Sequence, residues 1–348
     1  MQEVHSAFKN CGQKQGLEVW RIENFEPVPV PQQQYGSFYT GDSYIVLKTT
    51  GTTSLSWDIH FWLGSGTTQD EAGTAAILTV TLDDGQFEGA AVQHRETQGH
   101  ESKQFLEYFK PAIRYLEGGH ASGFSHVTTN EGSKKRLFQI KGKRHVRLRQ
   151  VAANISSMNK GDCFILDVDH DIYLYVGEKA NRMERLNASA IANQIRDQDH
   201  NGRANVEIID PYSHEGDVDK FFEALGSGDK DSVPEDTEGG DDEAFEKNTP
   251  LEATLSEISD KTGQMKITKL PKPNKKELLD TKECYVLDTG SSVYVWVGRK
   301  SNEKEKAEAF KRAEHYLKQN NYPAWVHVSK VPEGAEPAAF TQCFENWK

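Results

Sequence analysis

Three copies of one pattern occur in this chain, and they constrain its fold more than any single motif does. Each copy has an acidic residue before an apolar stretch, a second apolar stretch that ends in glycine, and a glutamate seven residues later. The residues of the three copies are Asp42, Gly64 and Glu71; Asp162, Gly177 and Glu184; and Glu283, Gly298 and Glu305. The three glutamates are 113 residues (71 to 184) and 121 residues (184 to 305) apart. This spacing allows one small domain per copy.

The apolar patterning predicts the same succession of strands and helices in each copy. The expected strands are 16–23, 43–47, 57–63 and 92–95; 136–140, 146–149, 163–167, 172–176 and 206–209; and 263–270, 284–288, 293–297 and 324–328. The expected long helices are 69–82, 182–198 and 303–319, and the short ones are 101–109, 217–225 and 337–344. Strands that are neighbours in the sequence, with helices grouped after them, predict an α+β fold with a mostly antiparallel central sheet.

Charge and cysteine content restrict the class of protein. The net charge of −12 over 348 residues argues against a nucleic-acid-binding protein. Cys163 and Cys284 hold the same place in their copies, so we expect buried free thiols in a reducing compartment. The sequence shows no signal peptide and no apolar run of about 18 residues. We therefore expect a cytosolic protein without a transmembrane segment.

An acidic stretch separates the second copy from the third. Residues 229–246 contain nine Asp and Glu residues against one lysine, and they include Gly239 and Gly240. Such a composition predicts a flexible segment unless something binds it. On composition alone, the stretch is also well explained as a solvated spacer.

The repeated glutamate has two explanations. Thr68, Asn181 and Asn302 each precede a repeated glutamate by three residues, which is the pattern of a helix capping box. Capping does not explain the acidic residue before each central strand. Two carboxylates brought together repel each other and need a cation, and oxygen ligands of this kind suit Ca²⁺. Paired histidine or thiolate ligands are not evident, which argues against Zn²⁺.

Sequence motifs of catalysis are not evident. The chain has no Gly-x-Ser-x-Gly, no phosphate-binding Gly-Lys-Thr loop and no His-Glu-x-x-His. Its 12 histidines are scattered, and surface or core positions explain each of them. We expect a binding or structural protein rather than an enzyme.

The first long helix differs from the other two. Positions that are charged in the third helix hold apolar or uncharged residues here, namely Ala72, Thr74, Ile77, Leu78 and Val80. An apolar exposed helix face is typical of a partner site. The alternative is that another part of the first copy covers this face.

A basic stretch opens the second copy. Residues 134–150 contain eight Lys and Arg residues and no acidic residue, and alternation places most of them on one face of a hairpin turning at Gly142. This stripe predicts an acidic partner or anionic lipid headgroups. A solvated edge strand protected by its charge is the alternative.

From about Ser6 to Lys348 the chain resembles the gelsolin–villin–severin family. The most specific stretches are 16–21, 39–44, 83–84, 92–96, 121–124, 136–142 and 161–167. The resemblance implies three gelsolin-like domains, each with a central sheet between a long and a short helix. It also implies calcium-activated severing of actin filaments and capping of their barbed ends, with inhibition by phosphoinositides. The length is similar to that of a severin or fragmin, or to the N-terminal half of a gelsolin.

The resemblance implies domain boundaries and roles. Residues 1–127 form the first repeat, which would cap actin through a monomer-type contact. Residues 128–226 form the second repeat, which would bind the filament side. Residues 227–250 are the acidic linker, and residues 251–348 form the third repeat. A cytoplasmic, cytoskeletal monomer is expected.

The family also implies calcium ligands. They are the Gly41 carbonyl, Asp42, Glu71 and the His120 carbonyl in the first repeat; Asp83 and the carbonyls of Gly89 and Ala91 for an ion shared with actin; the Gly161 carbonyl, Asp162, Glu184 and Asp236 in the second; and Glu283 and Glu305 in the third.

Actin and lipid contacts are implied in the same way. Ile77 and Leu78 would anchor the first helix in a cleft of actin. The surface that grips the filament side would include Arg136, Lys143, Arg144 and Arg185. Phosphoinositides would bind Lys110, Arg114, Arg136, Lys141, Lys143 and Arg144. Two alternatives remain open: a protein that caps without severing, and a phosphoinositide-binding adaptor at the membrane surface.

Overall fold

The computed structural model describes residues 4–120, 135–142, 145–235, 253–259, 266–290, 292–302, 308–323 and 325–347. The chain divides into two compact units. Unit 1 comprises residues 1–30, 42–102 and 247–348, and unit 2 comprises residues 31–41 and 103–246. Four predicted site residues lie outside the described ranges: Lys143, Arg144, Asp236 and Glu305.

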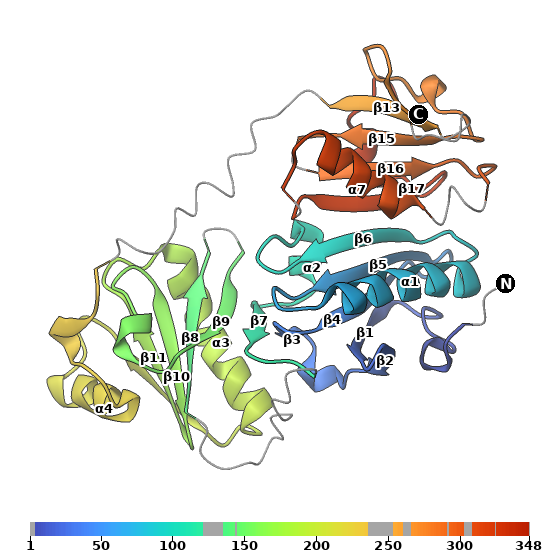
Figure 1. Ribbon diagram of the computed structural model, residues 1–348. Helices are drawn as coiled ribbons and strands as arrows, with labels where there is room; N and C mark the ends of the chain where they lie inside the picture. Colours follow the sequence, from blue (N-terminus) through green and yellow to red (C-terminus); the bar gives the residue numbers. More distant parts are fainter. Residues whose placement is uncertain are drawn as a thin grey trace. The chain divides into compact units, whose positions relative to one another are not determined.

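Unit 1 is built on a ten-stranded sheet in the order β14-β13-β15-β16-β17-β6-β5-β4-β1-β2 (Figure 1). Its strands are β1 (Gly16–Glu23), β2 (Glu26–Pro29), β4 (Ser43–Thr50), β5 (Ser56–Leu63), β6 (Val92–Thr97), β13 (Thr254–Ser259), β14 (Lys266–Lys269), β15 (Cys284–Asp288), β16 (Ser292–Val297) and β17 (His327–Pro332). Its α-helices are α1 (Gln69–Gln86), α7 (Ala309–Gln319) and α8 (Ala338–Thr341).

Helices α1 and α7 cover the same face of this sheet (Figure 1). Ala75 of α1 and Phe61 of β5 are in one buried cluster, against which Phe310 of α7 also packs. The rings of Phe61 and Phe310 meet edge to face, with centroids 5.1 Å apart. The opposite face of β15 and β16 is covered by α8, whose Phe340 is fully buried.

The first and third repeats join where β6 pairs antiparallel with β17. Three residue pairs define the register: Gln93 with Lys330, His94 with Ser329, and Arg95 with Val328. Strand β6 also pairs in parallel with β5. Both edges of β6 are therefore hydrogen-bonded, so it is an interior strand of the sheet.

Unit 2 is built on a seven-stranded sheet in the order β12-β11-β10-β8-β9-β7-β3. Its strands are β3 (Ser37–Tyr39), β7 (Ile113–Leu116), β8 (Arg136–Lys141), β9 (Arg147–Val151), β10 (Cys163–Val168), β11 (Asp171–Val176) and β12 (Asn205–Ile209). Its α-helices are α2 (Lys103–Glu107), α3 (Arg182–Asp199) and α4 (Glu215–Leu225).

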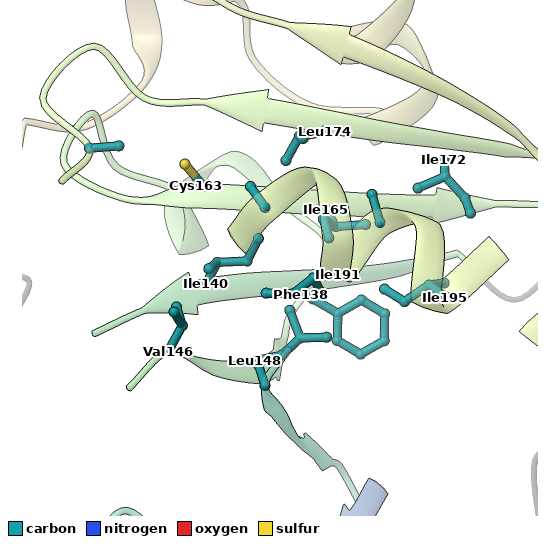
Figure 2. Packing of buried hydrophobic residues seen from close by; sticks show 14 of the residues in the cluster. Phe138, Ile140, Val146, Leu148, Cys163, Ile165, Ile172, Leu174, Ile191 and Ile195 are labelled. Atoms are coloured by element: carbon teal, nitrogen blue, oxygen red, sulfur yellow. The ribbon is translucent and has the colours of Figure 1, made fainter. Parts of the chain in front are cut away.

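Period-two alternation divides the apolar residues of this sheet between two cores. Figure 2 shows Ile140, Cys163 and Ile165 of the strands facing Ile191 and Ile195 of α3. Their neighbours Phe164 and Leu166 point to the other face, where Phe221 and Phe222 of α4 pack on them. The second repeat is therefore a sheet between a long and a short helix.

The α+β fold expected from the sequence is confirmed, with corrections to single elements. Strand β13 lies at Thr254–Ser259, where no strand is expected. The last strand is His327–Pro332 rather than 324–328, and the first short helix is only Lys103–Glu107. Strands β2, β3 and β7 are also absent from the expectation. Within the described residues, every helix is too short or too polar to cross a membrane.

Candidate cation and partner sites

The three copies of the repeated pattern share one backbone contact. In each copy the glycine N–H donates to the carbonyl of the acidic residue that precedes the first central strand. The N···O distances are 3.0 Å for Gly64 to Asp42, 3.1 Å for Gly177 to Asp162, and 3.1 Å for Gly298 to Glu283. The sequence pattern therefore corresponds to one local geometry that occurs three times.

In the second repeat the acidic residue is buried, and uncharged amide groups donate hydrogen bonds to its side chain. Asp162 is 5% exposed. Its Oδ2 accepts from the side-chain amides of Gln139 at 2.6 Å and Asn159 at 2.8 Å. Asn159 Oδ1 also accepts from the backbone N–H groups of Gly161 and Asp162. These neighbours orient the carboxylate without supplying a positive charge.

Glu184 is 1% exposed and caps its own helix. Its Oε2 accepts from the Asn181 N–H, while Asn181 Oδ1 accepts from the Glu184 N–H, so the predicted capping box is present. Its Oε1 accepts from the Gly142 N–H at 3.1 Å. Burial, then Glu184, and to a smaller extent Asp162 raise the pKa of Cys163 to about 12. Both carboxylates thus act on the same thiol.

The start of the acidic linker is held beside this site. The Lys160 N–H donates to the Pro234 carbonyl at 3.0 Å. Lys160 and Lys179 donate to the two oxygens of Glu235 at 2.7 and 2.8 Å. These hydrogen bonds lower the pKa of Glu235 to about 2. The chain is therefore anchored one residue before Asp236, the predicted ligand that lies outside the described residues.

In the first repeat the acidic residue is paired with an arginine. Asp42 is fully buried, and its Oδ2 accepts from Arg21 Nε at 2.7 Å and Nη2 at 2.5 Å. Glu71 forms the capping box predicted with Thr68. The other two predicted ligands, Gly41 and His120, belong to unit 2, where the Gly41 N–H donates to the Gly118 carbonyl at 2.7 Å.

The structure brings together the residues predicted for the ion shared with actin. Asp83 is fully buried; its Oδ1 accepts from the Ala91 N–H at 2.9 Å, and its carbonyl accepts from the Gly89 N–H at 3.2 Å. Oδ2 accepts from Gln93 at 2.5 Å, and the ammonium of Lys330 lies 3.5 Å away. Burial raises the pKa of Asp83, and Lys330 opposes that shift.

In the third repeat the structure describes only one of the two predicted ligands. Glu283 is half-buried before β15, and its carbonyl makes the shared contact with Gly298. Its predicted partner Glu305 lies outside the described residues.

The outer face of α1 carries the two predicted actin anchors. Ile77 is 64% exposed. Leu78 is half-buried and packs against the core of the first repeat. Of the two predicted anchors, Ile77 is therefore exposed, whereas Leu78 contributes to the packing of the first repeat.

The basic hairpin forms as predicted between β8 and β9, with Lys141 opposite Arg147. Arg136, however, is mostly buried and forms ion pairs with Asp167 and Asp199. Arg114, buried in the same unit, makes two hydrogen bonds to Asp199, at 2.8 and 3.0 Å.

The remaining predicted basic residues lie nearer the surface. Lys110 and Arg185 are exposed, whereas Lys141 is half-buried. Arg185, in the first turn of α3, donates to the carbonyls of Gly177, Glu178 and Ala180 in the segment that precedes this helix.

Sequence reasoning missed a group of histidines. The interpretation of each histidine as a surface or core residue does not identify this group, in which the buried rings of His60 and His94 stack with centroids 4.3 Å apart. Asp58, His60 and His94 offer ligand atoms that all lie within 4.8 Å of one another. The Asp-x-His spacing on one strand was visible in the sequence, but the partner His94 follows only from the pairing of β5 with β6.

Known proteins resemble this chain over nearly all of its length. The Gelsolin repeat model matches residues 24–106, 144–213 and 267–341. "Gelsolin" of Drosophila melanogaster is 52% identical over 99% of this chain and 44% of that protein. "Actin depolymerising venom protein gelsolin 1" of Platymeris rhadamanthus is 46% identical over 99% of this chain and 93% of that protein. "Gelsolin, cytoplasmic" of Homarus americanus is 47% identical over 98% of this chain and 46% of that protein.

The chain therefore spans less than half the length of two of these relatives and nearly the whole length of the third. The three matched segments each contain one copy of the acid–glycine–glutamate pattern. On this basis, the chain belongs to the gelsolin family.

Proposed function

We propose that this protein is a calcium-regulated, actin-binding protein that severs filaments and caps their barbed ends in the cytoplasm. The observation that carries the proposal is the second-repeat site, where two buried carboxylates lie beside an anchored acidic linker. The similarity to a relative named for actin depolymerisation, which this chain matches over 93% of that protein, supports actin as the partner.

The second-repeat residues suit a calcium ion. Asp162 and Glu184 supply carboxylate oxygens, and Gly161 supplies a carbonyl, which is the kind of donor set that Ca²⁺ takes. The described partners of the Asp162 side chain are neutral amides, so a bound cation would add the charge that two buried carboxylates lack. Glu235 is held by two lysines, and this supports Asp236 as a further ligand. Calcium would then order the linker.

The first repeat would use Gly41, Asp42, Glu71 and His120 for its own ion, and Asp83, Gly89 and Ala91 for an ion shared with actin. Asp83 accepts hydrogen bonds from the N–H groups of Ala91 and Gly89, and the proximity of these three residues supports the second of these sets. Glu283 and Glu305 would serve the third repeat.

Actin would be bound mainly by the first two repeats. Exposed Ile77 on α1 supports a wedge-like contact, because an aliphatic side chain that is 64% exposed gains free energy when a partner buries it. Exposed Arg185, together with Lys143 and Arg144, would bind the filament side. No covalent chemistry is required, since contacts with this protein replace contacts between actin subunits.

Phosphoinositides would compete for the basic residues of the second repeat. Lys110, Lys141, Lys143 and Arg144 would take this role, and of these Lys110 is exposed and Lys141 is half-buried. Arg114 and Arg136 are held by Asp199, so their contribution would require that ion-pair network to open.

A calcium titration tests the proposal. Filament length and calcium binding are measured for the wild type, for Asp162→Asn and for the control Asp219→Asn, which changes an exposed acid on α4. We expect Asp162→Asn to need more calcium for severing and to bind one ion fewer, while the control behaves as the wild type. Equal calcium requirements for all three proteins would exclude the second-repeat site as the switch.

The same assay separates severing from the alternative of capping alone. Severing shortens preformed filaments at stoichiometric protein, whereas capping alone blocks barbed-end growth and leaves filament lengths unchanged. A membrane-surface adaptor would instead bind phosphoinositide liposomes equally well before and after Ile77→Asp, with no effect on actin in either case.

A further inference from the structure

Strand pairing gathers a set of nitrogen and oxygen ligands inside unit 1. In the parallel pair β5–β6, His60 lies opposite His94, and Asp58 lies two residues before His60 on the same face. His60 is fully buried and His94 is 3% exposed, whereas the side chain of Asp58 is 22% exposed. One atom from each of the three side chains lies within 4.8 Å of the other two.

Both imidazole rings are oriented through their Nδ1 atoms. His60 Nδ1 lies 2.8 Å from Glu96 Oε1, and His94 Nδ1 lies 2.9 Å from Ser329 Oγ. Metal-binding histidines in proteins are held in this way, because a carboxylate or similar partner fixes the tautomer and directs the other nitrogen at the metal. On the His94 ring, Nε2 is directed at Asp58 Oδ1, 2.7 Å away.

We propose that Asp58, His60 and His94 form a binding site for a zinc-like divalent cation, with water as a fourth ligand. Two imidazole nitrogens and one carboxylate oxygen are a common zinc donor set and differ from the all-oxygen shell that Ca²⁺ takes. Ligand atoms around tetrahedral Zn²⁺ are roughly 3.4 Å apart, so small side-chain movements suffice to reach this geometry. The partly exposed Asp58 gives solvent access to the site.

The resting state of the cluster is compatible with metal binding. A ring nitrogen binds a metal only in its deprotonated form, so a bound cation would replace the hydrogen bond that joins His94 Nε2 to Asp58 Oδ1. In the absence of metal, the hydrogen bond between His94 and Asp58 occupies the same place, and a purely structural histidine cluster is the competing explanation.

The site also involves the third repeat. Ser329, which holds the His94 ring, lies on β17, and the ring of His327 on that strand stacks near His94 with centroids 5.8 Å apart. Because these partners come from β17, metal affinity should depend on the pairing of β6 with β17. The site would thus link the first repeat to the third.

Metal binding by the full chain tests the proposal. Zn²⁺ is titrated by calorimetry in excess Ca²⁺, and Co²⁺ serves as a spectroscopic probe of tetrahedral nitrogen and oxygen ligation. We expect one equivalent bound by the wild type, and at least a tenfold weaker affinity for His60→Gln and for Asp58→Asn. The control His170→Gln, at an exposed turn before β11, should bind as the wild type does.

A second variant separates orientation of the ligands from ligation itself. Ser329→Ala should weaken Zn²⁺ binding about 10- to 100-fold while the Co²⁺ spectrum keeps its shape. Thermal unfolding without metal checks that each variant folds; if His60→Gln does not, the near-isosteric Asp58→Asn decides. Absence of binding in the wild type, or equal binding by Asp58→Asn and the wild type, would overturn the proposal in favour of a structural cluster.

Discussion

Gly177 shows how a single residue type is dictated by the repeated site. A Cβ at this position would lie 2.4 Å from the Asp162 carbonyl oxygen and 2.6 Å from that of Lys160. Both neighbours are backbone atoms, which cannot move aside as a flexible side chain can. The repeated glycine is therefore explained by the close approach of two chain segments at the acidic residue.

Gly177→Ala should destabilise the second repeat. Overpacking against backbone typically costs about 1–3 kcal/mol, whereas Ala in an open helical position gains up to about 1 kcal/mol over Gly. The matched control is Gly216→Ala, on α4, where an added Cβ meets nothing within 4 Å. Urea unfolding midpoints of the two variants should shift in opposite directions. A Gly177→Ala protein as stable as the wild type would contradict the steric explanation.

Asp199 is a carboxylate that forms ion pairs with two arginines, Arg114 and Arg136. Burial by itself would raise the pKa of Asp199, but Arg114 and Arg136 outweigh it and hold the pKa below its ordinary value. A carboxyl whose pKa is lower in the folded state stabilises the fold above its unfolded pKa of about 3.9. This stabilisation is lost as the pH falls through the folded pKa.

Asp199→Asn should therefore destabilise the protein by about 3 kcal/mol near pH 7, because two buried arginines lose a charged partner. The control Asp197→Asn removes an exposed pair with Arg196 and should cost less than about 1 kcal/mol. Denaturant unfolding at pH 7 and pH 3 measures both effects. The difference between Asp199→Asn and the wild type should shrink at pH 3; a difference independent of pH would exclude the electrostatic cause.

At the level of elements, helix α1 has a capped N-terminus and an exposed apolar residue, Ile77. Its capping box satisfies N–H groups of the first turn, and Ala75 and Leu82 anchor it in the core. Because these contacts hold the helix, Ile77 contributes little to folding. The helix can therefore present an apolar side chain to a partner without loss of its own stability.

Ile77→Asp should reduce actin affinity at least tenfold while changing the free energy of unfolding by less than about 0.5 kcal/mol. The charge prevents burial in an apolar cleft, whereas the exposed site in the free protein tolerates it. Tyr212→Asp, at a 95% exposed loop position, is the control and should leave actin binding unchanged. Cosedimentation and thermal melting provide the two readouts. Retained actin binding by Ile77→Asp would remove α1 from the interface.

For the molecule as a whole, the pairing of β6 with β17 makes one sheet of the first and third repeats. It places Lys330 beside Asp83, a residue proposed to bind an ion shared with actin. A lysine ammonium and a metal cation compete for the same carboxylate charge. The third repeat would therefore oppose ion binding at Asp83 for as long as β6 and β17 remain paired.

Lys330→Gln should lower the calcium concentration needed for actin binding. Both side chains of this pair are buried, so loss of the ammonium leaves the Asp83 carboxylate without its charged partner, and we expect the calcium midpoint to fall at least about fivefold. Lys318→Gln, an exposed change on α7, is the control. Calcium titrations of actin cosedimentation compare the two variants with the wild type. An unchanged or higher midpoint for Lys330→Gln would show that this lysine does not compete with calcium.

Local patterns determined much of this protein. The acid–glycine–glutamate repeat, the α+β class and the capping boxes at Thr68 and Asn181 all follow from residues close together in the sequence. Strand β13 was missed because Leu255 and Ile258 give little alternation, and its pairing with β15 fixes it as a strand. The last strand was misplaced because buried Lys330 looks like a surface residue until Asp83 is seen beside it.

Only the tertiary structure decided which charged groups and which histidines meet. His60 and His94 are 34 residues apart, and Lys330 is 247 residues from Asp83, so neither contact leaves a local signal. Arg136 belongs to a basic stretch that predicted an acidic partner or anionic lipid headgroups, yet Asp199 of the same unit forms an ion pair with it. The physical reason is common to all three cases. Hydrophobic periodicity assigns a residue to a face of a strand, but strand order and register select its neighbours on that face.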